Sequence, residues 1–327
     1  MKKIPIFFTF DDNYVEPAAV AFYSLLNKAK EDVFYEMYVL SSHISSNKKQ
    51  ILYNVVSRFK NGTLKFIETN NFLDSSWENN TFSNKQGGTV FTSDAIVRCF
   101  AAKFFPQYDK IIYSDVDVIF VDDISDLIEI QIEDKYIAGV KNAFMKYNSF
   151  ELSHLNQKHY NMLKDSYFAG GIWVLNLDKI RNENLEEKML TIIEDKTIVK
   201  RWNDQDIMNI ACENKVAYIP LNYISYPYLA DLLVKDNFIS HYTREELYDS
   251  IINPKIIHFA ANKPWNSNPK YENLWWSIFS YLELERTGIF SDERNFVEKK
   301  YHKYKKTTMT LSVICLILII VICYNIM

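Results

Sequence analysis

The 327-residue chain is poor in cysteine, and this scarcity excludes two common ways of stabilising a protein. Its four cysteines are Cys99 and Cys212 in the main part of the chain and Cys315 and Cys323 in an apolar tail. None forms the Cys-x-x-Cys spacing of a metal site, and nothing indicates a disulfide framework. Such cysteine usage is typical of a reducing, cytosolic compartment.

The chain also has little net charge, no internal repeat and no low-complexity linker. Its 37 basic and 41 acidic residues give a net charge of −4, so we expect no general affinity for nucleic acid. Apolar side chains are abundant, since 48% of the residues are hydrophobic and 15% are aromatic. This composition predicts a substantial buried core, and the length suits one large α/β domain with an appendage.

A cleavable signal peptide is not predicted either. Lysines and an apolar run open the chain, but the run stops at Asp11 and Asp12, and no small-residue cleavage site follows. We interpret residues 4–10 as a buried first strand.

The longest uncharged segment lies at the other end of the chain. Residues 307–327 carry no charge and are rich in Ile, Leu and Val, and five lysines between 299 and 306 precede them. As a helix this segment would extend about 31 Å, the thickness of a bilayer core. Basic flanks tend to stay on the cytoplasmic side. We therefore predict a basic neck at 291–306 and a single-pass membrane anchor at 307–327, with a buried core helix as the alternative.

Strand-like and helix-like segments alternate before that tail. Apolar runs predict strands at 4–10, 36–40, 64–67, 110–113, 172–177 and 255–259. Helical spacing predicts helices at 15–28, 47–59, 93–105, 203–212 and 274–284. This alternation predicts a Rossmann-like fold for residues 1–290, with a mostly parallel sheet and helices on both faces. Ligands of such sheets bind at the carboxyl ends of the strands.

The most informative motif is Asp115-Val116-Asp117, which follows the apolar run at 110–113. In an extended chain, residues two apart point to the same side, so the two carboxylates can share one hard cation. A cation held in this way usually serves a phosphate-bearing substrate, because it offsets the charge of the leaving group. Two solvated aspartates in a turn are the alternative.

Two further polar features fall near the ends of predicted strands. In the segment from Thr9 to Tyr14, Asp11 and Asn13 can hydrogen-bond a base edge and Tyr14 can stack on it, or the segment can be a loop that caps a helix. Arg98 can hold sugar hydroxyls or phosphate if it faces a cleft. On an exposed helix face it would be only a solvated charge.

Two later segments add candidates of the same kind. Gly170-Gly171 would let the backbone approach a ligand, and Asp204 and Gln205 can bond sugar hydroxyls, although turns and caps use the same residues. His258 ends an apolar strand and Lys263 follows in a loop. Imidazole suits manganese and lysine suits phosphate, while a structural histidine is the alternative.

Together these segments resemble glycosyltransferase family 8, retaining enzymes of the GT-A fold that include bacterial lipo-oligosaccharide galactosyl- and glucosyltransferases and glycogenin. The likeness covers about residues 4–285. It rests on five segments in order: FTFDDNY (8–14), RCFAAKFFPQYDKIIYSDVDV (98–118), YFAGGIWVLNL (167–177), NDQDIMN (203–209) and IIHFAANKPW (256–265). Their order and spacing together are more specific than any one of them.

The resemblance implies a role for each candidate. The ligands of Mn²⁺, or of Mg²⁺, would be Asp115, Asp117 and His258. The uridine of a UDP-sugar would be held by Thr9, Asp11, Asn13 and Tyr14, and the diphosphate by Lys263. The donor sugar would be contacted by Arg98, Asp204 and Gln205, with Gln205 nearest the anomeric carbon.

Three positions depart from the family pattern. Ala169 stands where the family usually has Asn, which removes one expected sugar contact and could signal a different donor sugar. Ala261 replaces a common Gly, so close backbone approach to phosphate is less assured, and Ser114 replaces a usual Leu. None of these changes removes a metal ligand.

The leading hypothesis is a retaining transferase that moves a hexose, glucose or galactose, from a UDP-sugar to a glycan. A membrane anchor would place the catalytic domain in the cytoplasm and favour a lipid-linked acceptor such as lipopolysaccharide, capsule or glycolipid. The alternatives are a nucleotide-sugar hydrolase or nucleotidyltransferase, and a catalytically silent membrane scaffold with the same fold.

Overall fold

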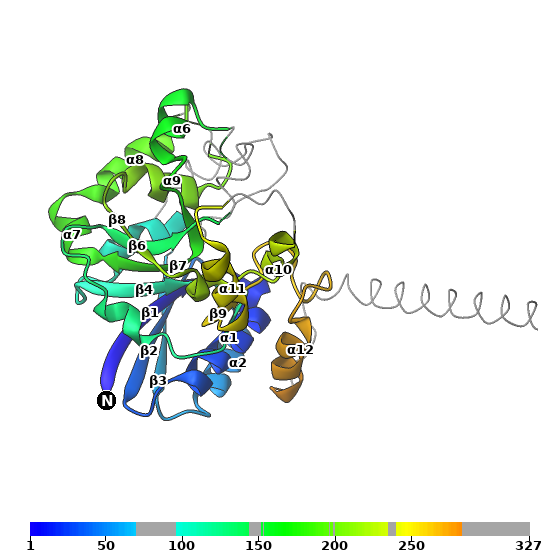
Figure 1. Ribbon diagram of the computed structural model, residues 1–327. Coiled ribbons are helices and arrows are strands. Elements are labelled where there is room, and N and C mark those ends of the chain that lie inside the picture. The colour runs from blue at the N-terminus through cyan, green and yellow to red at the C-terminus, as the bar shows by residue number, and fades with distance from the viewer. Residues whose placement is uncertain are drawn as a thin grey trace, which may run out of the picture.

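The computed structural model describes residues 1–69, 96–143, 152, 154–195, 197–198, 200–234 and 240–282. Its centre is a seven-stranded sheet in the order β3-β2-β1-β4-β7-β6-β8 (Figure 1). The strands are β1 (Lys2–Thr9), β2 (Val33–Ser41), β3 (Gly62–Glu68), β4 (Lys110–Ser114), β6 (Ile137–Lys141), β7 (Phe168–Asn176) and β8 (Val216–Ile219). A separate antiparallel pair joins β5 (Val118–Phe120) to β9 (Ile256–His258).

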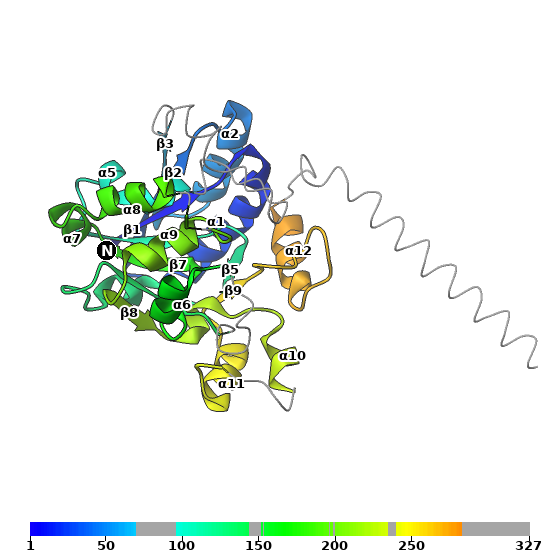
Figure 2. The ribbon, with the colours of Figure 1, turned by 90° about the horizontal axis from the view of Figure 1, so that it is seen from above.

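Helices cover both faces of this sheet (Figures 1 and 2). The α-helices are α1 (Val15–Lys28), α2 (Ser46–Val56), α5 (Ala101–Phe104), α6 (Gln157–Leu163), α7 (Leu177–Asn182), α8 (Leu185–Glu194), α9 (Asp204–Ala211), α10 (Leu229–Leu233), α11 (Arg244–Ile252) and α12 (Glu272–Tyr281). Short 3-10 turns are η1 (Asp12–Tyr14), η2 (Arg98–Phe100), η3 (Ser125–Glu129) and η4 (Leu221–Ile224).

Successive residues of the central strands contribute to two different hydrophobic cores. On β1, Ile6 and Phe8 belong to the core that contains α1 and α2, whereas Phe7 belongs to the core that contains α7, α8 and α9. Side chains alternate across a strand, so a sheet that is buried on both faces needs apolar residues at nearly every position. This explains why the strands stand out in the sequence as unbroken apolar runs.

The predicted Rossmann-like α/β architecture is confirmed. The pairs β1/β2, β2/β3, β1/β4 and β6/β8 are parallel, and only β7 runs antiparallel to its two neighbours. The helix predicted at 15–28 has the bounds of α1. The strand predicted from residue 172 begins earlier, at Phe168, so Gly170 and Gly171 lie inside β7.

Two local predictions were incomplete. The helix predicted at 93–105 is helical through most of its described part, with α-helical residues at 96–97, the 3-10 turn η2 and then the four-residue helix α5. Tertiary contacts of Arg98, given below, outweigh helix propensity there. The strands β6 and β8 were not predicted, because they are only five and four residues long and lie where the apolar pattern loosens.

The predicted transmembrane helix, and the membrane localisation drawn from it, need correction. Among the described residues, no helix combines the length and the apolar composition needed to cross a bilayer. The last described helix, α12, has 10 residues, whereas a spanning helix needs about 20. The predicted neck at 291–306 and anchor at 307–327 lie outside the described residues.

Candidate active site

The aspartate pair lies at the carboxyl edge of the parallel part of the sheet. Strands β1 and β4 are parallel neighbours, so the turn after Thr9 and the turn after Ser114 open on the same edge. Two backbone hydrogen bonds fix the aspartates in place. The Asp115 amide donates to the Gly171 carbonyl over 3.0 Å, and the Phe259 amide donates to the Asp117 carbonyl over 2.9 Å.

Three candidate metal ligands converge there. Strand β5 pairs with β9 so that Val118 lies opposite His258, which brings the imidazole to the aspartates. His258 Nε2 lies 3.2 Å from Asp117 Oδ1 and 3.5 Å from Asp115 Oδ2, and one ligand atom from each residue falls within 4.8 Å of the others. Two carboxylates and an imidazole are a donor set that suits Mn²⁺ and also Mg²⁺.

A glycine makes room for the histidine in this arrangement. A Cβ at Gly171 would lie 2.5 Å from His258 Nδ1. Real Cβ atoms essentially never come that close, so a larger residue would push the imidazole away from the aspartates. The small residues noted in the sequence therefore shape the candidate metal site as well as the strand.

On one side of the pair, Asp115 faces a buried arginine. Arg98 Nη1 donates to Asp115 Oδ1 over 2.6 Å and also to the Tyr113 hydroxyl, while Nη2 pairs with the Asp204 carboxylate. The guanidinium carbon lies 4.8 Å from the ring centroids of both Tyr113 and Trp173. Arg98 is therefore held by charge and by aromatic faces at once.

Burial dominates the protonation of Asp204. Burial raises the pKa of this carboxyl to about 6; the Arg98 charge opposes the rise, and the Asp115 charge adds to it. The same cluster raises the pKa of Arg98, because its anionic neighbours outweigh its burial. The arginine is therefore a permanent cation, and Asp204 is the member of the cluster that can gain a proton near neutral pH.

On the other side of the pair, Asp117 faces a lysine. Lys263 Nζ pairs with Asp117 Oδ2 and lies 3.3 Å from the Ala260 carbonyl oxygen. Burial acts to raise the pKa of Asp117, but Lys263 and His258 outweigh it and hold that pKa well below its usual range. Asp117 is thus ionised throughout the neutral range, as a metal ligand must be.

Most of the predicted residues share one cavity of about 400 Å³. Those that line it are Arg98, Asp115, Asp117, Gln205, His258 and Lys263. Asp204 does not line the cavity and lies buried behind Arg98. A Cβ at Gly170 would lie 2.9 Å from Gln205 Oε1, so the glycine leaves space for this amide.

The four residues predicted to bind uridine lie outside the lining of this cavity. Asp11 Oδ1 accepts the Asn13 backbone amide over 2.9 Å, which is the helix-cap alternative for this segment. Thr9 Oγ1 lies 3.4 Å from the Tyr113 hydroxyl. Burial raises the pKa of Tyr14. The Lys263 charge acts to lower this pKa, and the Asp117 charge acts to raise it. Thr9 and Tyr14 therefore border the charged cluster, while Asp11 and Asn13 bond to each other.

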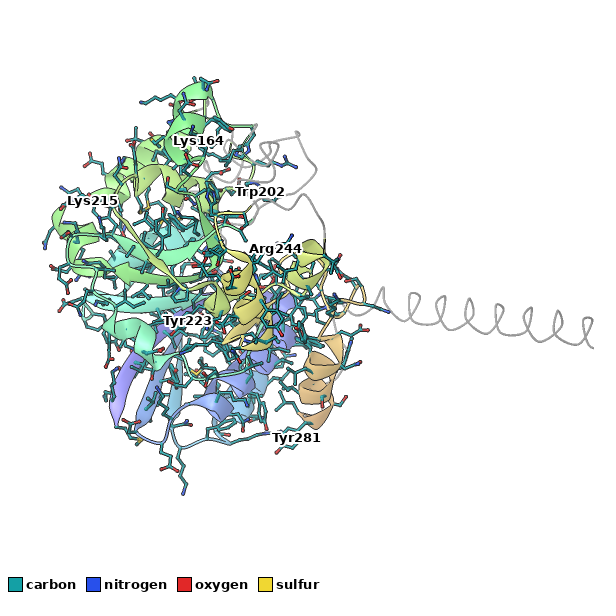
Figure 3. All side chains as sticks on the ribbon, in the orientation of Figure 1. Lys164, Trp202, Lys215, Tyr223, Arg244 and Tyr281 are labelled. Carbon is teal, nitrogen blue, oxygen red and sulfur yellow. The ribbon has the colours of Figure 1, made fainter. Side chains whose placement is uncertain are left out.

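Sequence reasoning missed several aromatic residues of the site. Tyr113 precedes Asp115 by two and so points to the same side of the chain, a signal that was available. Trp173 lies opposite Tyr113 in the β4/β7 pair, but nothing in the sequence distinguished it from the other apolar residues of β7. Trp202, which is labelled in the upper part of the molecule in Figure 3, lines the cavity. The Tyr226 ring lies 5.6 Å from that of His258. No motif pointed to either of the last two.

Comparison with known proteins agrees with this geometry. The chain is 27% identical over 248 residues to a putative glycosyltransferase of Haemophilus influenzae, covering 72% of this chain and 70% of that protein. It is 22% identical over 267 residues to a lipopolysaccharide 1,2-glucosyltransferase of Escherichia coli, covering 80% and 73%.

The fold has a close match among solved structures. The galactosyltransferase LgtC, solved in complex with donor and acceptor sugar analogs, superposes with a TM-score of 0.68 at 17% identity, over 89% of this chain and 99% of that one. This likeness confirms the GT-A fold. The family model of glycosyl transferase family 8 matches residues 5–269, and the chain belongs to that family.

Proposed function

We propose that this family 8 glycosyltransferase moves glucose or galactose from a UDP-hexose to a glycan acceptor, with retention of configuration. One observation carries the proposal: a single cavity holds the Asp115, Asp117 and His258 cluster beside Arg98 and Gln205. Groups suited to binding a metal-bound diphosphate therefore lie beside groups suited to binding a sugar. Retention rests on family membership alone.

The donor set at the aspartate pair fits a divalent cation, with Mn²⁺ first and Mg²⁺ possible. When bound, the cation would supply Lewis-acid stabilisation of the departing UDP. Lys263 adds a cationic group at the same place, and its ammonium would turn from Asp117 to the diphosphate. In this proposal the uridine is held by Thr9, Asp11, Asn13 and Tyr14, at the end of β1.

The hexose is assigned to the other side of the cavity. Arg98 forms an ion pair with Asp204 and donates to the Gly170 carbonyl over 3.3 Å, so its guanidinium is held in place. Its position is set before any sugar arrives, so the donor does not have to order it. The amide of Gln205 lines the cavity beside it and is the candidate for contact near the anomeric carbon.

The acceptor is proposed to be a glycan. The Escherichia coli relative is named for lipopolysaccharide, and this makes lipid-linked glycans the first acceptors to test. Ala169 and Ala261, which depart from the family pattern, leave the choice between glucose and galactose to experiment.

A donor screen tests the proposal. Purified protein is incubated with UDP-glucose, UDP-galactose and other UDP-sugars in Mn²⁺, with and without lipopolysaccharide core oligosaccharides, and both UDP release and glycoside formation are measured. We expect one UDP-hexose to give a glycoside product. Release of UDP without any glycoside would favour a nucleotide-sugar hydrolase, and no release from any donor would contradict the proposal.

A further inference from the structure

Each aspartate of the motif has one carboxylate oxygen near His258 and the other beside a cation. His258 Nε2 lies 3.5 Å from Asp115 Oδ2 and 3.2 Å from Asp117 Oδ1. The other oxygen of Asp115, Oδ1, pairs with Arg98. The other oxygen of Asp117, Oδ2, pairs with Lys263. The two oxygens near the imidazole are therefore placed to share a cation, and the partners of the outer oxygens decide how firmly that arrangement is kept.

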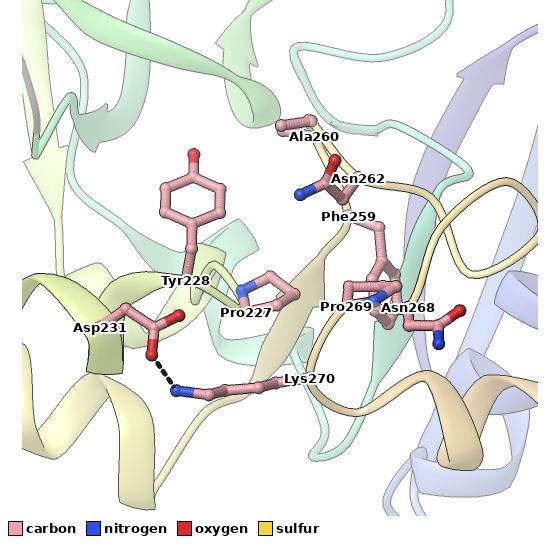
Figure 4. Close-up of a pocket in the computed structure, with 10 residues that line it drawn as sticks. Pro227, Tyr228, Asp231, Phe259, Ala260, Asn262, Asn268, Pro269 and Lys270 are labelled. Carbon is pink, nitrogen blue, oxygen red and sulfur yellow. Dashed lines mark hydrogen bonds and ion pairs between the residues drawn. The ribbon is translucent and has the colours of Figure 1, made fainter. Parts of the chain in front are cut away.

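The partner of Asp117 belongs to a loop with open space beside it. Lys263 follows β9, and Ala260, Ala261 and Asn262 of the same loop line a second cavity of about 250 Å³ (Figure 4). Lys263 itself lines the cavity of the candidate active site. An ammonium on a flexible stem can leave a carboxylate without a change in the fold. Asp117 is therefore the aspartate whose outer oxygen can change partners.

Asp115, by contrast, is held at both of its ends. Its backbone amide donates to the Gly171 carbonyl over 3.0 Å. Its carboxylate Oδ1 accepts from the Tyr113 hydroxyl as well as from Arg98. Because Tyr113 precedes Asp115 by two residues, the two side chains point to the same side of the chain. Turning the carboxylate of Asp115 away from its present direction would break these hydrogen bonds.

The fold leaves the Tyr113 hydroxyl little freedom. The residue is 1% exposed, and its ring centroid lies 5.1 Å from those of Phe7 and Trp173. The hydroxyl oxygen accepts an N–H of Arg98. A tyrosine keeps its proton at neutral pH, so the proton is available for the Asp115 carboxylate. The packing of the ring thus fixes a hydrogen-bond donor at one oxygen of Asp115.

Arg98 alone fixes the direction of this carboxylate less well. Its Nη1 group has two hydrogens and donates to Asp115, to the Tyr113 hydroxyl and to the Gly170 carbonyl, so at least one hydrogen is shared. The Tyr113 hydroxyl has one proton. The anionic Asp115 oxygen is a stronger acceptor for it than the Thr9 hydroxyl, which lies 3.4 Å away.

We propose that Tyr113 is a positioning residue of the metal site, whose hydroxyl holds Asp115 Oδ1 so that Oδ2 stays turned toward His258 before a cation arrives. This inference rests on the proposed function and deepens it. Asp115 becomes the ligand that is oriented in advance, and Asp117 the ligand that adapts when the diphosphate draws Lys263 away. Residues that orient a metal ligand in this way typically contribute about 10–100-fold to metal affinity.

Removal of this one hydroxyl tests the role. Tyr113→Phe keeps the ring and its aromatic neighbours and deletes only the donor. The matched control is Tyr35→Phe, because Tyr35 is also fully buried and its hydroxyl donates to a buried aspartate, Asp123, over 3.2 Å. Tyr35 lies near the start of β2, at the opposite end of the sheet from the metal site. The Mn²⁺ affinity of the full-length protein is measured without nucleotide and with UDP, together with the melting temperature.

We expect Y113F to bind Mn²⁺ about tenfold more weakly than the wild-type protein. Y35F should bind Mn²⁺ as tightly as wild type. Both variants lose one buried hydrogen bond, so their melting temperatures should fall by similar amounts. A loss of Mn²⁺ affinity in Y113F alone therefore separates an oriented ligand from a general loss of stability.

The possible failures are distinguishable. If Y113F binds Mn²⁺ as tightly as wild type, the role of Tyr113 is contradicted while the proposed function stands. An equal loss of affinity in Y113F and Y35F also contradicts it, because a weakened fold would then explain both. If the wild-type protein binds no Mn²⁺, with or without UDP, the metal site of the proposed function fails first, and the role of Tyr113 fails with it.

Discussion

The two aspartates of the motif have different surroundings, although they are two residues apart. Asp115 faces Arg98, which lies among buried aromatic rings and is paired with Asp204 on α9. Asp117 faces Lys263, which belongs to an irregular loop after β9. The first network joins separate elements of the core, whereas the second joins the core to a surface loop.

This difference predicts different roles for the two positively charged side chains. Arg98 is enclosed by its partners, so its charge is a fixed part of the fold. Lys263 has a flexible stem and three donors, and the loop around it is held by local hydrogen bonds such as that of the Ser267 amide to the Lys263 carbonyl, 3.0 Å. We expect changes on the Arg98 side to affect folding, and changes on the Lys263 side to affect ligand binding.

The largest effect is expected for the aspartates themselves. Asp117→Asn should lower hexose transfer about a thousandfold, because a metal site contributes several kcal/mol to transition-state charge stabilisation. The melting temperature should change little, and the kcat of the exposed-site variant Asp109→Asn should match wild type. Transfer by D117N within tenfold of wild type would contradict the metal assignment.

Stability should separate the two networks next. Arg98→Met leaves the buried Asp204 and the partly exposed Asp115 without their cation, and should reduce the free energy of unfolding by about 3–5 kcal/mol. Lys263→Met should cost less, because Asp117 keeps His258 as a neighbour and still borders the cavity. Urea denaturation of both variants measures the difference, and equal losses would remove the distinction drawn here.

The fold was more predictable from the sequence than the different surroundings of Asp115 and Asp117. Apolar runs located β1, β2, β3 and β4, because a sheet that is buried on both faces needs such runs. Asp115, Asp117, His258 and Lys263 were found because a motif and a family resemblance marked them. The contacts of Arg98 with Trp173 and Asp204 were not predictable, since these residues meet it only through tertiary packing.

The same reasoning explains the errors. A uniformly apolar tail predicted a membrane helix that the described part of the chain does not contain. The predicted helix at 93–105 is interrupted at Arg98, where ion pairs with two distant segments determine the backbone.

The pH dependence of hexose transfer should show the titration of Asp204, the partner of Arg98. The pKa of Asp204 is about 6, above its ordinary value of 3.8, so the folded state holds this proton more tightly than the unfolded chain. The contribution of this group to stability therefore falls as pH rises through that window. Transfer should decline below about pH 6, as the protonated carboxyl stops pairing with Arg98.

The variant Asp204→Asn isolates this group. Its activity should be lower than that of wild type and should lack the acid limb near pH 6 in a profile of kcat/KM. An acid limb of the same midpoint in D204N would assign the titration to another residue.

The smallest expected effect lies on the Lys263 side. Without its ammonium, Asp117 loses a competing cation, so K263M should bind Mn²⁺ a few times more tightly in the absence of nucleotide. Its affinity for UDP in the presence of Mn²⁺ should fall, because a diphosphate contact is lost. Calorimetric titrations measure both, and weaker Mn²⁺ binding by K263M would contradict the exchangeable role of this lysine.

The central claim is that the cavity holding Asp115, Asp117 and His258 is a metal-dependent UDP-sugar site. Titration of UDP into the wild-type protein, once in Mn²⁺ and once in EDTA, tests it most directly. The account predicts binding in Mn²⁺ that weakens at least about tenfold in EDTA, which is a loss of about 1.4 kcal/mol or more. Equal affinity in the two titrations, or no binding of UDP in either, would contradict it.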